Sequence, residues 1–357
     1  MDTQNPESTQ GAAENQADGA SAEPLQPSAN LAGSPASTAP EQPEHGFRVV
    51  FAGPHGIRSG WRLGIWVVAG LTAGFVLGGL ITPLVKHALA QSQALGIIFF
   101  DGVGFAGLLA ATLLMARIER RTLADYALPP REAFGPQFWQ GVVWGLVALS
   151  VLLGAIHLWH GFDLGTLALS GTRLADYAGL WALAFLIVGF FEESLMRSYA
   201  LFTLADGIRF WPAAGLLSGI FGAIHLGNGG ESWVGAVAAA LIGLFFCLTV
   251  RRTGSLWFAI GMHFSWDYAE SFIYSVPDSG AVIAGHLLNS SFHGPVWLTG
   301  GTVGPEASVF VFVIIAALFG VFGLTHRGVQ FPRPADSGPR EAEVAAGAAE
   351  SPLRLDV

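Results

Sequence analysis

The sequence predicts an all-α protein, a polytopic bundle of about eight transmembrane helices with a disordered tail at each end. Of the 357 residues, 52% are hydrophobic and only 12% are charged, and the mean hydropathy is +0.51. Soluble domains usually carry about 25% charged residues, so this composition indicates a membrane protein. Eight apolar stretches supply the spans, because a helix needs about 20 apolar residues to cross the hydrocarbon layer.

Composition divides the chain into three parts. Residues 1–45 are rich in Ala, Ser, Pro, Gln, Gly and Glu, and such a segment cannot bury enough apolar surface to fold alone. Residues 329–357 have the same character, so we expect disordered tails on both sides of a membrane-embedded bundle at 46–328. The first residues contain no basic segment followed by an apolar run, and a cleaved signal peptide is therefore not expected.

The apolar stretches set the approximate bounds of the expected helices. These spans are 63–84, 93–116, 138–158, 177–200, 210–227, 232–250, 255–275 and 307–326. The fifth is short and contains Gly215, Gly219 and Gly222. Small residues at this spacing let helix backbones approach closely, which predicts a span packed inside the bundle.

Basic residues predict the orientation of the spans. With eight spans and both termini in the cytoplasm, 14 of the 17 basic residues lie on the inner side. Lys86 and Arg173 lie outside, and Arg197 lies within a span. This bias follows the positive-inside rule, whereas an odd number of spans would scatter the charges. We therefore expect a multi-pass protein of the cell (inner) membrane with both termini cytoplasmic.

Composition also limits the partners of the chain. The net charge of −9 says little about partners, but the lack of a basic run or a stacking platform argues against nucleic-acid binding. Cys247 is the only cysteine, which excludes an intrachain disulfide and a thiolate zinc cluster. The expected partners are membrane lipid and a protein or peptide substrate, and the oligomeric state is left open.

Three ionisable residues stand within the fourth span. Ionisable groups are costly in hydrocarbon, so several in one span indicate a functional site. Glu193 and Arg197 are four residues apart and share a helix face, whereas Glu192 points elsewhere. Glu193 and Arg197 are therefore expected to form a buried pair that fixes helix packing. Glu192 has no partner on its own helix and is the candidate general base.

Two histidines in later spans complete the set. Phe221 and His225 lie one turn apart in the fifth span, where the phenyl ring can pack on the imidazole. His263 and Asp267 have the same spacing in the seventh span, where the carboxylate can hold the imidazole in one tautomer. Each alone is also explained as core packing or an isolated buried pair. Together with Glu192 they favour a shared site.

The order of these motifs resembles a known family. Glu-Glu-x-x-x-Arg, Phe-x-x-x-His and His-x-x-x-Asp on successive spans are similar to the CPBP family of intramembrane proteases. That family comprises type II CAAX prenyl endopeptidases and bacteriocin-processing or immunity proteins. The resemblance covers roughly residues 60–326, and the segment 300–308 is similar to a loop common in bacterial members.

The resemblance implies roles for the motif residues. Glu192 and His225 would activate water, while His263 and Asp267 would stabilise the oxyanion of the tetrahedral intermediate. The family often has Asn at the position of Asp267, and an ionised Asp cannot donate a hydrogen bond. Asp267 is therefore either protonated or it orients His263. The supporting residues of the same motifs are Glu193, Arg197 and Phe221.

No cofactor is expected, although one alternative involves a metal. Glu192, His225 and His263 could instead ligate a divalent metal such as zinc. The sequence lacks the His-Glu-x-x-His helix that anchors many such sites, so the metal-independent interpretation is favoured. Counted at about 1.5 Å per residue from the inner helix ends, the motif residues lie at depths compatible with one cavity opening to the cytoplasm.

The predicted activity is that of an intramembrane endopeptidase hydrolysing peptide bonds of membrane-associated proteins or peptides. Two alternatives stay open: a non-catalytic scaffold or immunity protein of the same fold, and a proton-coupled transporter, since Glu and His chains also relay protons. Asp101, in the second span, is interpreted as an interfacial or packing residue. Glu270 is considered as an extension of the Asp267 network.

Overall fold

The computed structural model describes residues 51–53 and 56–331. The predicted tails therefore lie outside the described residues, except for 329–331. Phe331 is buried against the rings of Phe202 and Phe210, at centroid distances of 4.0 and 5.4 Å. The packed chain thus extends three residues beyond the expected boundary at 328.

The described chain is mainly helical. Its α-helices are α2 (Ser59–Leu89), α3 (Gln93–Glu119), α4 (Pro136–Leu158), α5 (Gly171–Arg197), α6 (Tyr199–Ile208), α7 (Phe210–His225), α8 (Trp233–Thr253), α9 (Trp257–Asp267), α10 (Val296–Thr299) and α11 (Val309–Thr325). A π-helical segment, η3 (Tyr268–Ile273), continues α9. Short 3-10 turns are η1 (Leu123–Tyr126), η2 (Pro130–Glu132) and η4 (Pro305–Ala307).

Two small antiparallel strand pairs depart from the all-α prediction. β1 (Ala52–Gly53) pairs with β2 (Gly56–Ile57), and β3 (Phe162–Asp163) pairs with β4 (Ser291–Phe292). Each strand has only two residues, so the pairs join loops and form no layer of their own. The β3–β4 pair ties the connection between α4 and α5 to the long loop before α11.

Five helical segments are long and apolar enough to cross a membrane: α2, α3, α4, α5 together with α6, and α8. α7 and α11 are apolar but shorter, and α9 has 11 residues before the π-helix. On α2, Leu71, Phe75 and Leu84 expose 70%, 83% and 82% of their surface, as lipid-facing side chains do. The protein is thus a multi-pass membrane protein, and the number of eight crossings stays a prediction.

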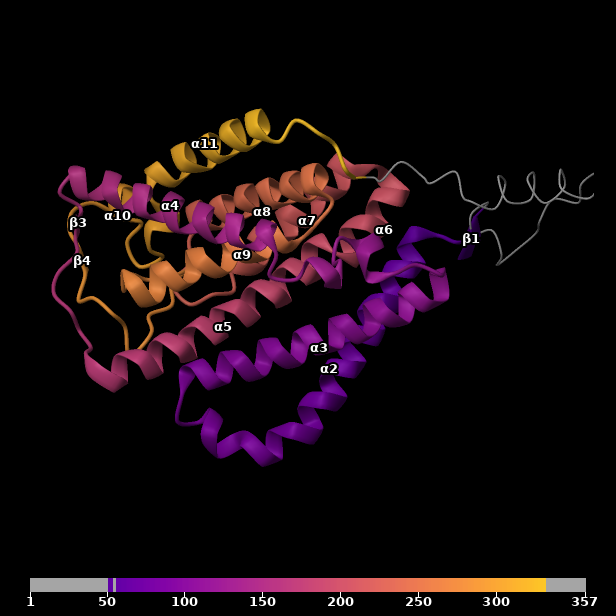
Figure 1. Ribbon diagram of the computed structural model, residues 1–357, viewed down its shortest axis with the longest axis horizontal. Helices are drawn as coiled ribbons and strands as arrows, with labels where there is room; N and C mark the ends of the chain where they lie inside the picture. Colours follow the sequence, from indigo (N-terminus) through magenta and orange to yellow (C-terminus); the bar gives the residue numbers. More distant parts are fainter. Residues whose placement is uncertain (1–50, 54–55, 332–357) are drawn as a thin grey trace, which may run out of the picture. The chain divides into compact units, whose positions relative to one another are not determined.

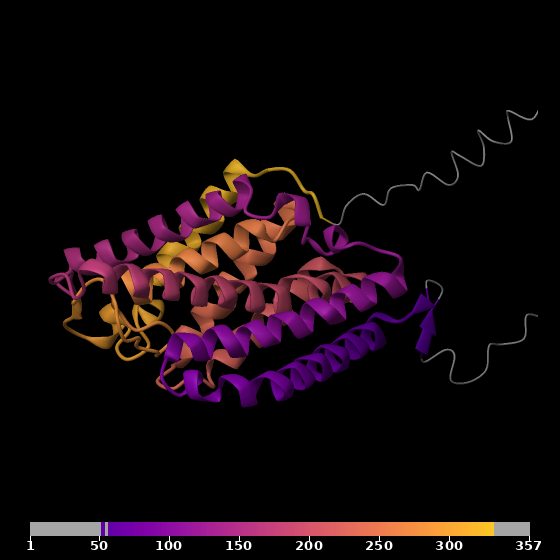
Figure 2. The same ribbon diagram turned by 60° about the horizontal axis from the view of Figure 1, so that its bottom comes forward.

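The helices pack side by side, and their neighbours include both antiparallel and parallel pairs (Figures 1 and 2). α2 lies along α3, α3 along α5, α5 along α9, α4 along α9 and α7 along α8. At the α4–α9 contact, a Cβ on Gly141 would lie 2.1 Å from the Phe258 carbonyl oxygen, and one on Gly261 would lie 2.1 Å from that of Phe138. Only glycine permits this backbone approach, which places α9 in the centre of the bundle.

The glycines of α7 are not equivalent, contrary to the sequence prediction. A Cβ on Gly222 would lie 2.3 Å from the carbonyl oxygen of Ala236, so this glycine does allow α7 to pack closely on α8. Gly215 and Gly219 are exposed and have no heavy atom within 4 Å of such a Cβ. The packing role is therefore confirmed for Gly222 and wrong for the other two, because no neighbouring element approaches Gly215 or Gly219.

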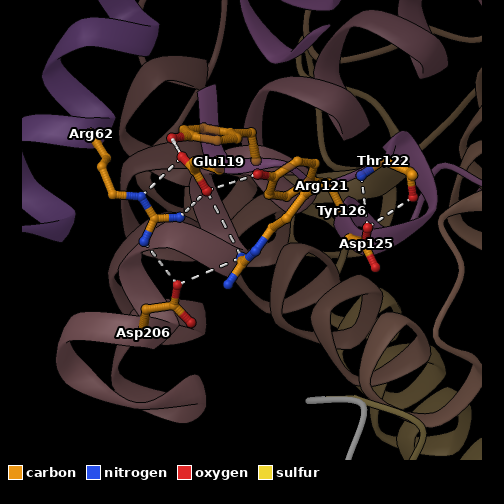
Figure 3. Close-up of polar contacts among 8 residues, drawn as sticks. Arg62, Glu119, Arg121, Thr122, Asp125, Tyr126 and Asp206 are labelled. Atoms are coloured by element: carbon orange, nitrogen blue, oxygen red, sulfur yellow. Dashed lines mark hydrogen bonds and ion pairs between the residues drawn. The ribbon is translucent and has the colours of Figure 1, made fainter. Parts of the chain in front are cut away.

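A polar cluster joins four elements at the end of the bundle that carries α6 (Figure 3). Glu119, at the end of α3, accepts hydrogen bonds from Arg62 of α2, from the Tyr126 hydroxyl at 2.8 Å and from the Tyr199 hydroxyl at 2.5 Å. Arg62 also donates to Asp206 of α6 at 3.0 Å. One carboxylate thus holds α2, α3, η1 and α6 together.

We expect Glu119→Ala to lower the free energy of unfolding by about 1–3 kcal/mol, because it leaves the donors of Arg62, Tyr126 and Tyr199 without their acceptor. Thermal unfolding of the purified protein in detergent measures the change. The matched control is Glu132→Ala, which truncates an exposed glutamate. Equal shifts for the two variants would contradict the structural role of Glu119.

Candidate active site

The buried pair predicted on α5 is present. Glu193 and Arg197 are fully buried, and the Arg197 Nη1 atom donates to the Glu193 Oε1 atom at 2.9 Å. The guanidinium also lies over the ring of Phe221 on α7, 4.2 Å from its centroid. Arg197 therefore neutralises Glu193 and at the same time connects α5 to the helix that carries His225.

His263 is oriented by Glu193, a contact that the sequence did not predict. The Nδ1 atom of His263 lies 2.8 Å from Glu193 Oε1, where it donates a hydrogen bond to the carboxylate. The Nε2 atom faces Asp267 Oδ2 at 3.4 Å and Glu192 Oε2 at 3.6 Å. The spacing within α9 could not reveal this, because the orienting contact comes from another helix.

The approach of α9 to α5 explains the contact between His263 and Glu193. A Cβ on Gly189, one turn before Glu193, would lie 3.3 Å from the carbonyl oxygen of Ile260. The missing side chain lets the two helix backbones come close at this level. Phe246 of α8 stacks on the other side of the imidazole, with ring centroids 5.9 Å apart. The ring of His263 is thus held by polar and aromatic contacts from two helices.

His225 is held by its own helix. Its Nδ1 atom donates to the backbone carbonyl of Phe221 at 2.8 Å, and the two rings lie 4.5 Å apart as predicted. Since a carbonyl oxygen only accepts hydrogen bonds, the neutral ring carries its proton on Nδ1. The Nε2 atom of His225 is then an acceptor, which a general base requires.

One cavity of about 480 Å³ brings the four predicted catalytic residues together: Glu192, His225, His263 and Asp267 all line it. Glu192 keeps 28% of its side chain exposed, whereas Glu193 is fully buried behind it. The two neighbouring glutamates therefore differ as predicted, one accessible from the cavity and one buried in a pair.

Three further acids on the cavity wall were missed as site residues. Asp101 of α3, interpreted from the sequence as an interfacial or packing residue, lines the cavity together with Glu192. Asp278 and Glu306 come from the loop between η3 and α11. Glu306 falls in the segment 300–308 that resembles a family loop, which was the only sequence signal for it. Asp278 gave no signal, because its loop has no periodic pattern.

The loops that line the cavity lie at one end of the bundle, and the membrane side to which the cavity opens stays a prediction. Its loop residues come from the α7–α8 connection (228–229) and from the loop before α11 (278–281 and 306). Asn228 and Gly229 are exposed. No lining residue comes from the connections at the end of the bundle that carries α6. Depth counts along single helices could not show which loops reach the cavity.

The residues predicted for a catalytic metal do not form a compact ligand set. Among the described residues, the group whose ligand atoms all lie within 4.8 Å of one another is Glu270, Asp278 and Glu306. The set of Glu192, His225 and His263 is not such a group. The Nδ1 atoms of both histidines are used in hydrogen bonds, so only their Nε2 atoms are free to act as acceptors or ligands. The arrangement of Glu192, His225 and His263 therefore gives no support for a metal shared by these three residues.

Gly243 of α8 makes room for the buried guanidinium, which leads to a prediction. A Cβ at this position would lie 2.3 Å from the Arg197 Nη2 atom. We expect Gly243→Ala to displace Arg197 and to lower the free energy of unfolding by about 1–3 kcal/mol, as overpacking does. Thermal unfolding measures it against Gly219→Ala, whose new methyl group meets open space. A loss no larger than that of the control would show that Arg197 tolerates the displacement.

The fold and the cavity describe a multi-pass membrane protein with a buried polar site built from glutamate and histidine. The family model for type II CAAX prenyl endopeptidase Rce1-like proteins matches residues 173–269, a segment that includes all four predicted catalytic residues. This match supports membership of the chain in the CPBP family and confirms the resemblance drawn from the motifs. It also supports a protease of the CAAX type. Nothing among the curated proteins or the solved structures matches the chain.

Proposed function

We propose that the chain is an intramembrane endopeptidase that uses Glu192 and His225 to activate water. The observation that carries this proposal is the single cavity lined by Glu192, His225 and His263. The accessible carboxylate of Glu192 and the free Nε2 atom of His225 can each accept a proton from water there. The substrates are membrane-associated proteins or peptides, and membrane lipid surrounds the bundle.

In this proposal Glu192 and His225 accept a proton, whereas His263 donates a hydrogen bond. Its Nδ1–H is engaged by Glu193, so the ring donates from Nε2 when both nitrogens carry protons. Placed beside Glu192, that N–H stabilises the negative charge on the carbonyl oxygen of the tetrahedral intermediate. Asp267 faces the same nitrogen at 3.4 Å and balances the charge of the imidazolium. Glu193, Arg197 and Phe221 support the site by holding His263 and the α5–α7 contact.

The test is cleavage of membrane peptides by the purified protein in proteoliposomes. Product formation that is lost in both Glu192→Ala and His225→Ala supports the proposal, and undiminished cleavage in both variants refutes it. A parallel reaction with a chelator decides whether a metal takes part in the chemistry. A scaffold or immunity protein would bind peptides without cleaving them. A proton-coupled transporter would show flux that depends on the same residues.

We further propose eight crossings with both termini cytoplasmic, in the cell (inner) membrane. The support is the distribution of basic residues, 14 on the inner side against 2 outside. In this orientation the loops that line the cavity are external. Peptide bonds would then be cleaved from the outer side of the membrane, which revises the cytoplasmic side expected from helix depths.

Cysteine labelling tests this orientation. Cys247 is fully buried, so the wild-type chain provides an unlabelled background. We expect a membrane-impermeant maleimide to label Val282→Cys in intact cells, since Val282 is 66% exposed in the loop beside the cavity. Glu132→Cys, exposed on the inner side, should react only after the membrane is opened. The reverse pattern would place the cavity on the cytoplasmic side.

A further inference from the structure

A second group of acids lies beside the candidate active site. Glu270 belongs to the π-helical end of α9, Asp278 to the following loop and Glu306 to η4, close to the start of α11. One carboxylate oxygen from each lies within 4.8 Å of the others. Three like charges at this separation cannot all be ionised without a compensating cation or proton. No ion pair with Lys or Arg supplies that charge in the described part of the chain.

Glu270 is the least satisfied of the three carboxylates. The residue is fully buried, and neither of its carboxylate oxygens has a hydrogen-bond partner among the described residues. The indole of Trp266 lies near enough to act on the carboxylate, but its N–H makes no hydrogen bond either. A buried ionised carboxylate without partners is strongly unfavourable, so Glu270 requires either a proton or a bound cation.

The other two carboxylates are held in fixed directions. Asp278 Oδ2 accepts a hydrogen bond from the Ser271 hydroxyl at 3.0 Å. Glu306 Oε2 accepts two from Ser279, from the backbone N–H at 3.1 Å and from the hydroxyl at 2.7 Å. Such contacts orient carboxylates at cation sites.

The backbone at Gly304 lies very close to the Pro277 carbonyl group and to the Glu270 carboxylate. Gly304 has φ +108°, and a Cβ there would lie 1.9 Å from the Pro277 carbonyl oxygen and 3.3 Å from Glu270 Oε1. Only glycine fits this position. The N–H of Gly280 donates to the Val303 carbonyl at 2.9 Å and joins the two ends of the loop. The three carboxylates are therefore brought together by a defined loop structure.

We propose that Glu270, Asp278 and Glu306 bind a hard divalent cation of the Ca²⁺ or Mg²⁺ type. A site of oxygen ligands alone favours such cations over zinc. Asp278 and Glu306 line the cavity, so water from the cavity can complete the coordination shell. The bound cation ties the loop between η3 and α11 to the end of α9. This site is distinct from Glu192, His225 and His263, and it does not depend on the proposed protease activity.

Equilibrium binding to the purified full-length protein tests the proposal, with Ca²⁺, Mg²⁺, Mn²⁺ and Zn²⁺ as separate probes at neutral pH. We expect one site per chain that prefers Ca²⁺, Mg²⁺ or Mn²⁺ to Zn²⁺, with a saturable rise in Tm on binding. Glu270→Gln and Glu306→Gln should each weaken binding at least about tenfold. Asp163→Asn, which neutralises an exposed acid on β3, should bind as the wild type does.

Three outcomes would overturn the proposal. The first is a wild-type protein that binds none of the oxygen-preferring cations up to about 10 mM, above the range of weak extracellular Ca²⁺ sites. The second is unchanged binding in Glu270→Gln. The third is a cation-free Tm of Glu270→Gln far below that of the cation-free wild type, since removing one of three repelling charges should leave the empty protein at least as stable. A Glu270→Gln variant that does not fold counts as the third outcome, and the wild-type titration tests the first outcome independently.

Discussion

Replacing Glu192 by Gln is expected to lower kcat/KM for peptide cleavage by about 10² to 10⁴-fold, the contribution that a general base typically makes. The amide keeps the size of the side chain but cannot accept the proton of the attacking water. Glu192 is partly exposed to the cavity and lies 3.6 Å from His263, so no buried pair is broken. The Tm of the variant should therefore stay close to that of the wild type.

The matched control for Glu192→Gln is Glu231→Gln, which neutralises a glutamate of the α7–α8 loop that does not line the cavity. Its cleavage rate should be close to that of the wild type. Steady-state kinetics of both variants on one peptide substrate measure the difference. Equal rates for Glu192→Gln and the wild type, at equal Tm, would remove Glu192 from the mechanism.

The largest loss of stability is expected for Arg197→Met. The change leaves the fully buried carboxylate of Glu193 without its 2.9 Å ion pair and removes the guanidinium from the Phe221 ring. Breaking a buried pair from one side costs about 3–5 kcal/mol, because the remaining charge is uncompensated. Chemical unfolding in detergent micelles should show this loss.

A double variant separates the charge effect from simple loss of packing. Glu193→Gln combined with Arg197→Met leaves no buried charge in the pair, so part of the lost stability should return. Cleavage should nevertheless stay impaired, because the carboxylate that orients His263 is gone. A single Arg197→Met variant within about 1 kcal/mol of the wild type would show that Glu193 is neutral or hydrated in the native protein.

The positions of the helices could largely be predicted from the sequence, because runs of about 20 apolar residues dominate the pattern. The separate helix α6 could not. It begins after Ser198, whose φ of −98° and ψ of −121° interrupt the helix. No proline or glycine at this point of the sequence predicts the interruption. The π-helical end of α9 was also invisible, since apolar periodicity does not distinguish helix types over six residues.

In the candidate site, contacts within one helix could be predicted from the sequence, whereas contacts between helices could not. The Glu193–Arg197 pair and the Phe221–His225 contact follow from helical periodicity, and both are present. The contact between His263 and Glu193 joins residues 70 positions apart. It depends on how α9 packs against α5, which single-helix reasoning cannot supply. Glu270 illustrates the point further, because the two carboxylates grouped with it, Asp278 and Glu306, come from outside its helix.

The central claim is that Glu192 and His225 act together on one water molecule, and a double-mutant cycle on cleavage rates tests it most directly. The rates of Glu192→Gln, His225→Ala and the double variant are compared with the wild type on one peptide. Losses in rate caused by removing groups that act as a unit do not multiply. The cleavage rate of the double variant should therefore be no lower than that of the less active single variant. Undiminished cleavage in both single variants, or losses that multiply in the double variant, would contradict the account.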